Sequence, residues 1–170
     1  MSAGPSYEIV LTKEDFKFSV AHFTVFGPTT AEVLHGHNYS VSVRVAGEST
    51  DNLGLLLDLS AFKTEIRRVC GSLDSRTLVP TECPLVEVGA AADAVDVRFG
   101  DLAYRLASES VVLLPIRNTS IEELALYFWQ QLAPSLSGTR ARGLSVEVAE
   151  TAGQSCAYVA PLSSEHGVSV

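Results

Sequence analysis

The chain has 170 residues, the size of one ordinary domain, and 46% hydrophobic with 19% charged residues is typical of a folded globular protein. Its net charge of −8 argues against sequence-independent binding to nucleic acid, which needs clustered Lys and Arg. No apolar stretch approaches the roughly 20 residues that cross a bilayer, and residues 1–7 lack the features of a signal peptide. Three cysteines without metal-ligand spacing favour a reduced, cytoplasmic setting.

Alternating hydrophobic residues predict several strands in the first third of the chain, at residues 7–12, 16–22, 37–47 and 53–59. The polar residues 13–15 predict a bend or bulge between the first two strands. Residues 23–33 contain Gly27-Pro28 and no sustained period, which predicts a loop.

A first helix is predicted over residues 61–71, capped by Asp58 or Ser60, with its apolar face formed by Phe62, Ile66 and Val69. A second helix is predicted to begin after Asn118 or Thr119, either of which can cap it, and to end at Pro134 and Gly138. Its predicted buried stripe consists of Leu124, Ala125, Phe128, Leu132 and Leu136.

Between the helices, residues 74–77 predict a turn and residues 80–84 a break. Short strands are then expected at 85–88, 95–99, 102–107 and 111–114. We interpret residues 78–116 as a small β excursion on the main sheet, with too few apolar residues for a core of its own.

The chain closes with predicted strands at residues 144–151 and 156–160, and with a polar tail at residues 163–170 that is expected to be mobile. The order of elements predicts an α+β fold in which an antiparallel sheet carries both helices on one face. We expect residues 1–170 to form a single domain.

The stretch Leu34-His35-Gly36-His37-Asn38-Tyr39 holds two histidines that share one face of a strand. His22 ends another predicted strand, and antiparallel pairing of the two strands brings three imidazoles together. Three histidine nitrogens with an open fourth position are a common way to hold a catalytic zinc. The alternative is that these are packed or hydrogen-bonded histidines, since His-x-His also recurs by chance.

Several motifs together resemble the 6-pyruvoyl-tetrahydropterin synthase and 6-carboxy-tetrahydropterin synthase family from about residue 16 to residue 158. They are Phe18-Ser-Val-Ala-His22, the Leu34-to-Tyr39 box, Gly54 with Asp58, Leu73-Asp74, Thr119-Ser-Ile-Glu122 and Glu150-Thr151. The resemblance implies the tunnelling fold (T-fold), whose subunits close into trimeric barrels that stack as a homo-hexamer.

The resemblance also implies a zinc ion on His22, His35 and His37, and a small-molecule pterin as the bound partner. It implies that Glu150 is the pterin anchor, and a forked carboxylate suits the paired N–H donors of a 2-aminopyrimidinone ring. Ser120 and Glu122 are the other substrate-binding residues that it implies. Outside the family context, Glu150 would be an ordinary exposed strand acid.

The chain departs from the family at the residues that move protons. The synthases use a cysteine in the loop before the histidine box and an Asp-His pair after the first helix. Here residues 23–34 contain no cysteine, and the pair reads Asp74-Ser75. The standard triphosphate-eliminating reaction is therefore not expected.

Glu32 stands three residues before His35 and offers a substitute base. A branch of the family has a glutamate there and cleaves the side chain of dihydroneopterin to give 6-hydroxymethyl-dihydropterin. A carboxylate near zinc can act as a general base, and Asp74 could orient a water or hydroxyl. The alternative is a solvated loop acid.

The sequence thus supports three hypotheses. The first is a zinc-dependent, aldolase-like lyase acting on a dihydropterin, with Glu32 and Asp74 as catalytic residues. The second is a pterin- or purine-like-binding protein without catalysis. The third, disfavoured by the missing cysteine, is a 6-carboxy-tetrahydropterin synthase of the queuosine pathway.

Overall fold

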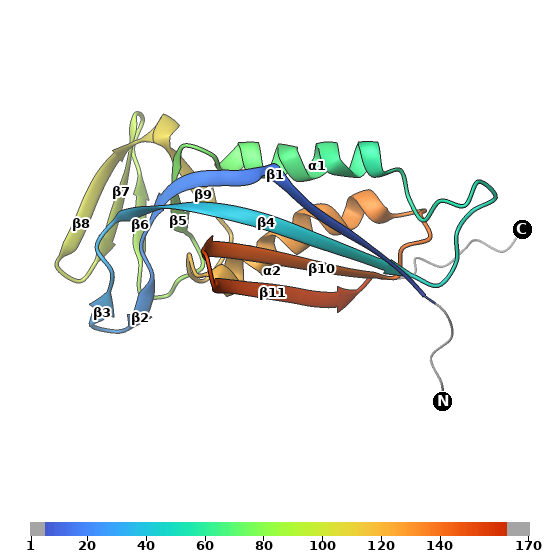
Figure 1. The fold of residues 1–170 in the computed structure, drawn as a ribbon. Helices are drawn as coiled ribbons and strands as arrows, with labels where there is room; N and C mark the ends of the chain where they lie inside the picture. The colour runs from blue at the N-terminus through green and yellow to red at the C-terminus, as the bar shows by residue number, and fades with distance from the viewer. Residues whose placement is uncertain (1–5, 163–170) are drawn as a thin grey trace, which may run out of the picture.

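The computed structural model describes residues 6–162, so the tail predicted to be mobile at residues 163–170 lies outside the described residues. A six-stranded sheet with the order β11-β10-β4-β1-β5-β9 forms the centre of the fold (Figure 1). Its strands are β1 (Tyr7–His22), β4 (His35–Gly47), β5 (Arg76–Pro80), β9 (Val111–Leu114), β10 (Gly143–Thr151) and β11 (Gln154–Pro161).

Two helices cover one face of this sheet, as predicted (Figure 1). Helix α1 (Leu59–Leu73) packs on β1, and α2 (Ile121–Leu132) packs on β10 and β11. A short 3-10 turn, η2 (Ala133–Leu136), extends α2. The α+β class is therefore confirmed. Within residues 6–162, neither helix is long and apolar enough to span a bilayer.

The main sheet contains the predicted antiparallel strands, and parallel pairings that were not predicted extend it at one edge. β1, β4, β10 and β11 pair antiparallel, whereas β5 runs parallel to both β1 and β9. Sequence reasoning assigned a turn and a break to most of β5, because it is a short segment that ends in Pro80. Parallel neighbours are joined by long crossovers, so no hairpin signal marks them.

The polar bend predicted in residues 13–15 is a bulge inside one continuous strand. Between the pairs Thr12↔Ser42 and Lys17↔Ser40, the four residues 13–16 of β1 oppose only residue 41 of β4. The inward-facing positions consequently change from odd, at Leu11, to even, at Phe16 and onward. Asp15 in the bulge is bound by Arg67 of α1 at 2.6 Å.

Three strands of the excursion form a separate sheet of order β6-β7-β8, whereas its last strand, β9, pairs with β5 at the edge of the main sheet. The strands are β6 (Glu87–Ala90), β7 (Ala94–Phe99) and β8 (Leu102–Ala107), and the 3-10 turn η1 (Ser108–Ser110) leads into β9. Their apolar face is completed from outside the excursion by Phe23 and Val25, so a second hydrophobic cluster exists. It contains Phe23, Val25, Val79, Cys83, Val95, Val97, Phe99 and Val111.

The segment predicted as a loop contains a short hairpin, β2 (Val25–Gly27) and β3 (Thr30–Ala31), at the same end of the molecule as β6–β8 (Figure 1). The predicted strand at residues 53–59 is wrong, because residues 51–58 form turns. Asp51 Oδ1 accepts the N–H groups of Leu53 and Leu55, which closes a turn typical of Asp.

The helix caps were only partly predicted. Asp58 caps α1, accepting from Ser60 N at 2.8 Å and Ala61 N at 3.1 Å. Ser120, and not the predicted Asn118 or Thr119, caps α2. The predicted buried stripe of the second helix is confirmed, from Leu124 to Leu136.

Replacing Asp58 by alanine should lower the free energy of unfolding by about 1 kcal/mol, because two N–H groups of α1 lose their acceptor. Urea denaturation followed by far-UV circular dichroism measures this loss. Asp58→Asn is the matched control, since asparagine caps as well as aspartate does. Equal losses in both variants would contradict the assigned cap.

Candidate functional site

His22, His35 and His37 meet at one end of the β1–β4 pair. The register places His22 directly opposite His35, with His37 two residues along the same face of β4. One ring nitrogen of each histidine lies within 4.8 Å of the others, and His35 Nε2 is 3.0 Å from His37 Nε2. His22 is buried, whereas the other two are partly exposed. The structure thus brings together all three predicted ligands.

Backbone carbonyls fix the orientation of two of the imidazoles. His22 Nδ1 lies 3.2 Å from Thr119 O, and His35 Nδ1 lies 2.9 Å from Val33 O. A carbonyl oxygen can only accept, so each Nδ1 carries the proton and each Nε2 of a neutral ring carries a lone pair. Burial, with the neighbouring His35, lowers the pKa of His22 despite the opposing charge of Glu150, which favours the neutral ring.

Glu150 contacts the histidine cluster directly. Its Oε1 is 3.3 Å from His22 Nε2, 3.6 Å from His37 Nε2, and accepts the Tyr39 hydroxyl at 2.8 Å. Its Oε2 accepts from Gln154 Nε2 at 2.8 Å. Burial and the hydrogen bond to Glu150 raise the pKa of Tyr39, so the phenol keeps its proton and donates it to the carboxylate.

His22, Tyr39 and Glu150 share a single proton, that of the Tyr39 hydroxyl, where their polar atoms meet. The Tyr39 proton points to Glu150, so it is not available to His22 Nε2, which lies 3.1 Å from the Tyr39 oxygen. His22 Nε2 and Glu150 Oε1 therefore face each other as two acceptors. Two nitrogens that share a tetrahedral zinc lie about 3.3 Å apart, close to the spacing of His35 and His37. The donor set fits a divalent cation such as zinc.

Glu32 lies in the segment between β3 and β4, three residues before His35. Its Oε2 accepts from Thr24 N at 2.9 Å, and its own N–H donates to Thr24 O, so the residue is tied to the chain just after β1. Burial opposes ionisation of Glu32, but the Thr24 hydrogen bonds and the nearby His35 and His22 outweigh it and lower its pKa. The carboxylate is therefore ionised near neutral pH.

Asp74 sits at the end of α1 and contacts β1. Its Oδ1 accepts from Ser19 N at 2.7 Å and its Oδ2 from the Ser75 hydroxyl at 3.2 Å. Ser75 adopts a left-handed backbone with φ of 59° and donates its N–H to Ser19 O. Within residues 6–162, no hydrogen bond or ion pair joins Asp74 to the histidines.

The two other predicted substrate-binding residues lie at the start of α2. The Ser120 hydroxyl accepts from Glu123 N at 3.4 Å as the helix cap. Glu122 is exposed in the first turn, and no hydrogen bond or ion pair in the described part of the chain joins it to the histidines.

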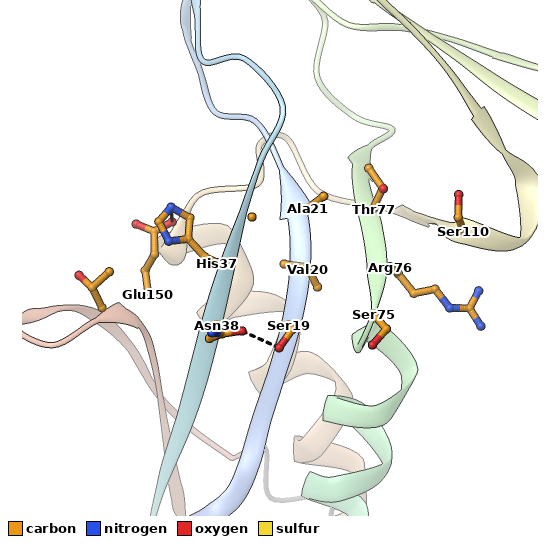
Figure 2. Close-up of a pocket in the computed structure, with 12 residues that line it drawn as sticks. Ser19, Val20, Ala21, His37, Asn38, Ser75, Arg76, Thr77, Ser110 and Glu150 are labelled. Carbon is orange, nitrogen blue, oxygen red and sulfur yellow. Dashed lines mark hydrogen bonds and ion pairs between the residues drawn. The ribbon is translucent and has the colours of Figure 1, made fainter.

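A cleft of about 560 Å³ opens beside His37 and Glu150. Figure 2 shows His37 and Glu150 together on one side of β4, with Ser75, Arg76 and Ser110 beyond β1. Ser19 Oγ donates to Asn38 Oδ1 at 2.6 Å between these two groups. His37 is the member of the histidine cluster that lines this cleft, together with Glu150.

Sequence reasoning missed several residues that build this site. Asn118 binds Val25 twice, accepting its N–H at 3.1 Å and donating to its carbonyl at 2.8 Å, while the Thr119 hydroxyl donates to Phe23 O. These contacts hold the chain directly after His22. Tyr39 could have been found from the sequence, because it lies two residues after His37 and its side chain therefore lies on the same face of the strand.

Comparisons with known proteins agree with this geometry. The family model of 6-pyruvoyl tetrahydropterin synthase matches residues 11–161. The "Putative 6-carboxy-5,6,7,8-tetrahydropterin synthase" of Methanocaldococcus jannaschii is 30% identical over 145 residues, which are 84% of this chain and 88% of that protein.

Solved structures of 6-pyruvoyl tetrahydropterin synthase from Plasmodium vivax are similar over nearly the whole chain. One has a TM-score of 0.86 and 29% identity, covering 92% of this chain and 99% of that one. A variant of the same enzyme, in which a catalytic glutamate is replaced by alanine, has a TM-score of 0.86 and 28% identity over the same shares. Sequence motifs, fold and histidine cluster together show that the chain belongs to the 6-pyruvoyl tetrahydropterin synthase family.

Proposed function

We propose that this protein is a zinc-dependent lyase that cleaves the side chain of a dihydropterin, with Glu32 as its general base. The observation that carries the proposal is the convergence of His22, His35 and His37, whose ligand nitrogens lie within 4.8 Å of one another. Glu32 is held near this end of β1 by its hydrogen bond from Thr24 N, two residues after His22. Zinc held by His22, His35 and His37 would supply a Lewis acid that polarises the side-chain oxygens of the substrate.

Glu32 is suited to take a proton from the hydroxyl on the second carbon of the substrate's side chain. The bond between the first and second carbons then breaks, and its electron pair passes into the pterin ring. Glu32 returns the proton to the first carbon. The products are a two-carbon aldehyde and a 6-hydroxymethyl-dihydropterin, so the step needs no outside oxidant or reductant.

Two comparisons support an enzyme over a binding protein without catalysis. The P. vivax synthase is described with a catalytic glutamate, which is the residue type that Glu32 supplies here. The M. jannaschii relative has a 6-carboxy-tetrahydropterin synthase name, so that reaction is the second candidate. Against it stands the absence of a cysteine from residues 23–34, the segment in which the family's synthases have their proton-transferring cysteine.

We further propose Glu150 as the anchor of the pterin ring. It is 13% exposed and lines the cleft beside His37, and its partner Gln154 is exposed enough to turn away when a ligand arrives. Ser120, Glu122 and Asp74 stay candidates on the family resemblance alone. The cytoplasmic location stays an expectation from the cysteine content. A homo-hexamer also stays a prediction, supported by the open edge of β11, where Val159 is 70% exposed.

The purified protein should contain about one zinc per chain, and His35→Ala should reduce that content at least tenfold, because one of three ligands is removed. Atomic emission measures the metal. Asn38→Ala is the control, since Asn38 lies on the same strand but on its opposite face. A zinc content far below one ion per chain in the unaltered protein would contradict the proposed zinc-dependent lyase.

Glu32→Gln should lower the rate of aldehyde release from dihydroneopterin by at least about 100-fold, because the amide cannot take a proton. Substrate affinity and zinc content should change little. Glu48→Gln, an exposed acid beyond the far end of β4, is the control. Incubation with dihydroneopterin triphosphate in parallel reports the second candidate reaction. Tight pterin binding without turnover in the unaltered protein would instead favour the binding-protein alternative.

Glu150→Ala should weaken pterin affinity by about tenfold or more, since a charged hydrogen-bond acceptor contributes about 1.5–3 kcal/mol. Fluorescence titration with a dihydropterin measures the affinity, with the zinc content determined on the same samples. Glu147→Ala, on the opposite face of β10, should bind as the unaltered protein does. Unchanged affinity in Glu150→Ala would remove Glu150 as the anchor.

A further inference from the structure

The excursion between β5 and β9 reaches the metal-binding cluster through one side chain. Tyr104 lies on β8, opposite Val97 of β7, and its hydroxyl oxygen accepts the N–H of Leu34 at 3.1 Å. Leu34 directly precedes His35, the first residue of β4. The site lies at the end of the molecule where β6–β8 and the β2–β3 hairpin gather (Figure 1).

The N–H group that Tyr104 binds belongs to the same peptide unit as the carbonyl that orients His35. His35 Nδ1 donates to Val33 O at 2.9 Å, and Val33 O and Leu34 N–H lie on the two sides of one peptide bond. A peptide unit is planar and rigid, so holding its N–H also holds its carbonyl. A hydrogen-bonded chain therefore runs from Tyr104 through this peptide to the His35 ring.

The position of the Tyr104 hydroxyl is itself fixed by packing. The ring lies 6.1 Å from the ring of Phe23, centroid to centroid, and packs against the second hydrophobic cluster. Ala31 and Leu34, from the segment that carries Glu32, pack against the same cluster. The excursion thus supports the segment from residue 31 to residue 34 both by apolar contact and by this hydrogen bond.

We infer that Tyr104 is a positioning residue for the metal ligand His35, acting through the Val33–Leu34 peptide. Acceptance of the Leu34 N–H polarises the peptide and strengthens the bond from Val33 O to His35 Nδ1. A stronger hydrogen bond at Nδ1 raises the basicity of Nε2 and fixes the orientation of the ring. Hydrogen-bond partners of metal-bound histidines commonly have this effect. This inference rests on the zinc site of the proposed function.

Tyr104→Phe tests the inference, because it keeps the ring and removes the hydroxyl alone. The affinity for Zn²⁺, measured on metal-stripped protein by competition with a chromogenic chelator, should fall about tenfold. The positions or intensities of the absorption bands of bound Co²⁺ should also change in the variant, because the imidazole of His35 is held less firmly. Thermal unfolding of the metal-stripped proteins shows whether the fold is intact.

Tyr127→Phe is the matched control, since Tyr127 is a partly buried tyrosine on α2, and no hydrogen bond or ion pair within residues 6–162 joins it to the histidines. It should bind Zn²⁺ and Co²⁺ as the unaltered protein does. An affinity of Tyr104→Phe within twofold of the unaltered protein would overturn the inference, as would equal losses in both variants. Absence of metal binding in the unaltered protein would instead overturn the proposed function, and this inference with it.

Discussion

The pairing of β1 with β4 is the contact on which both the sheet and the histidine cluster depend. It sets His22 opposite His35, and the bulge at residues 13–16 turns the second half of β1 so that His22 faces inward. A slip of one residue in this register would send the imidazole of His22 to the other face of the sheet. The core residues Phe18 and Tyr39, which stack at 5.0 Å, share that register and resist such a slip.

Much of this arrangement could be predicted from short stretches of sequence, because its causes are local. Alternation along residues 16–22 and 37–47 marks the two strands, and it also places the three histidines on one face. The 3.6-residue period likewise marks both helices. Where an apolar run lacked alternation, at residues 53–59, the prediction was wrong, because Asp51 closes a turn that leaves Leu53 82% exposed.

Other features depend on contacts between distant parts of the chain and leave no local pattern. Tyr104 and Leu34 are 70 positions apart, and Asn118 and Val25 are 93 apart, so nothing near either residue indicates its partner. The parallel strand β5 was missed for the same reason, since its neighbours are β1 and β9 and not the next strand along the chain. The residues that support the histidine cluster are thus harder to predict than the histidines.

The division of the interior into two hydrophobic clusters has a consequence for how heat inactivates the protein. The cluster beneath β6–β8 is smaller than the one between the helices and the main sheet, and it packs against the segment that carries Glu32 and precedes His35. Cooperative units of a protein can open separately, and the unit with fewer buried contacts opens first. Function would then fail at a temperature below the melting point, by a sub-global opening that leaves the six-stranded sheet intact and is reversed on cooling.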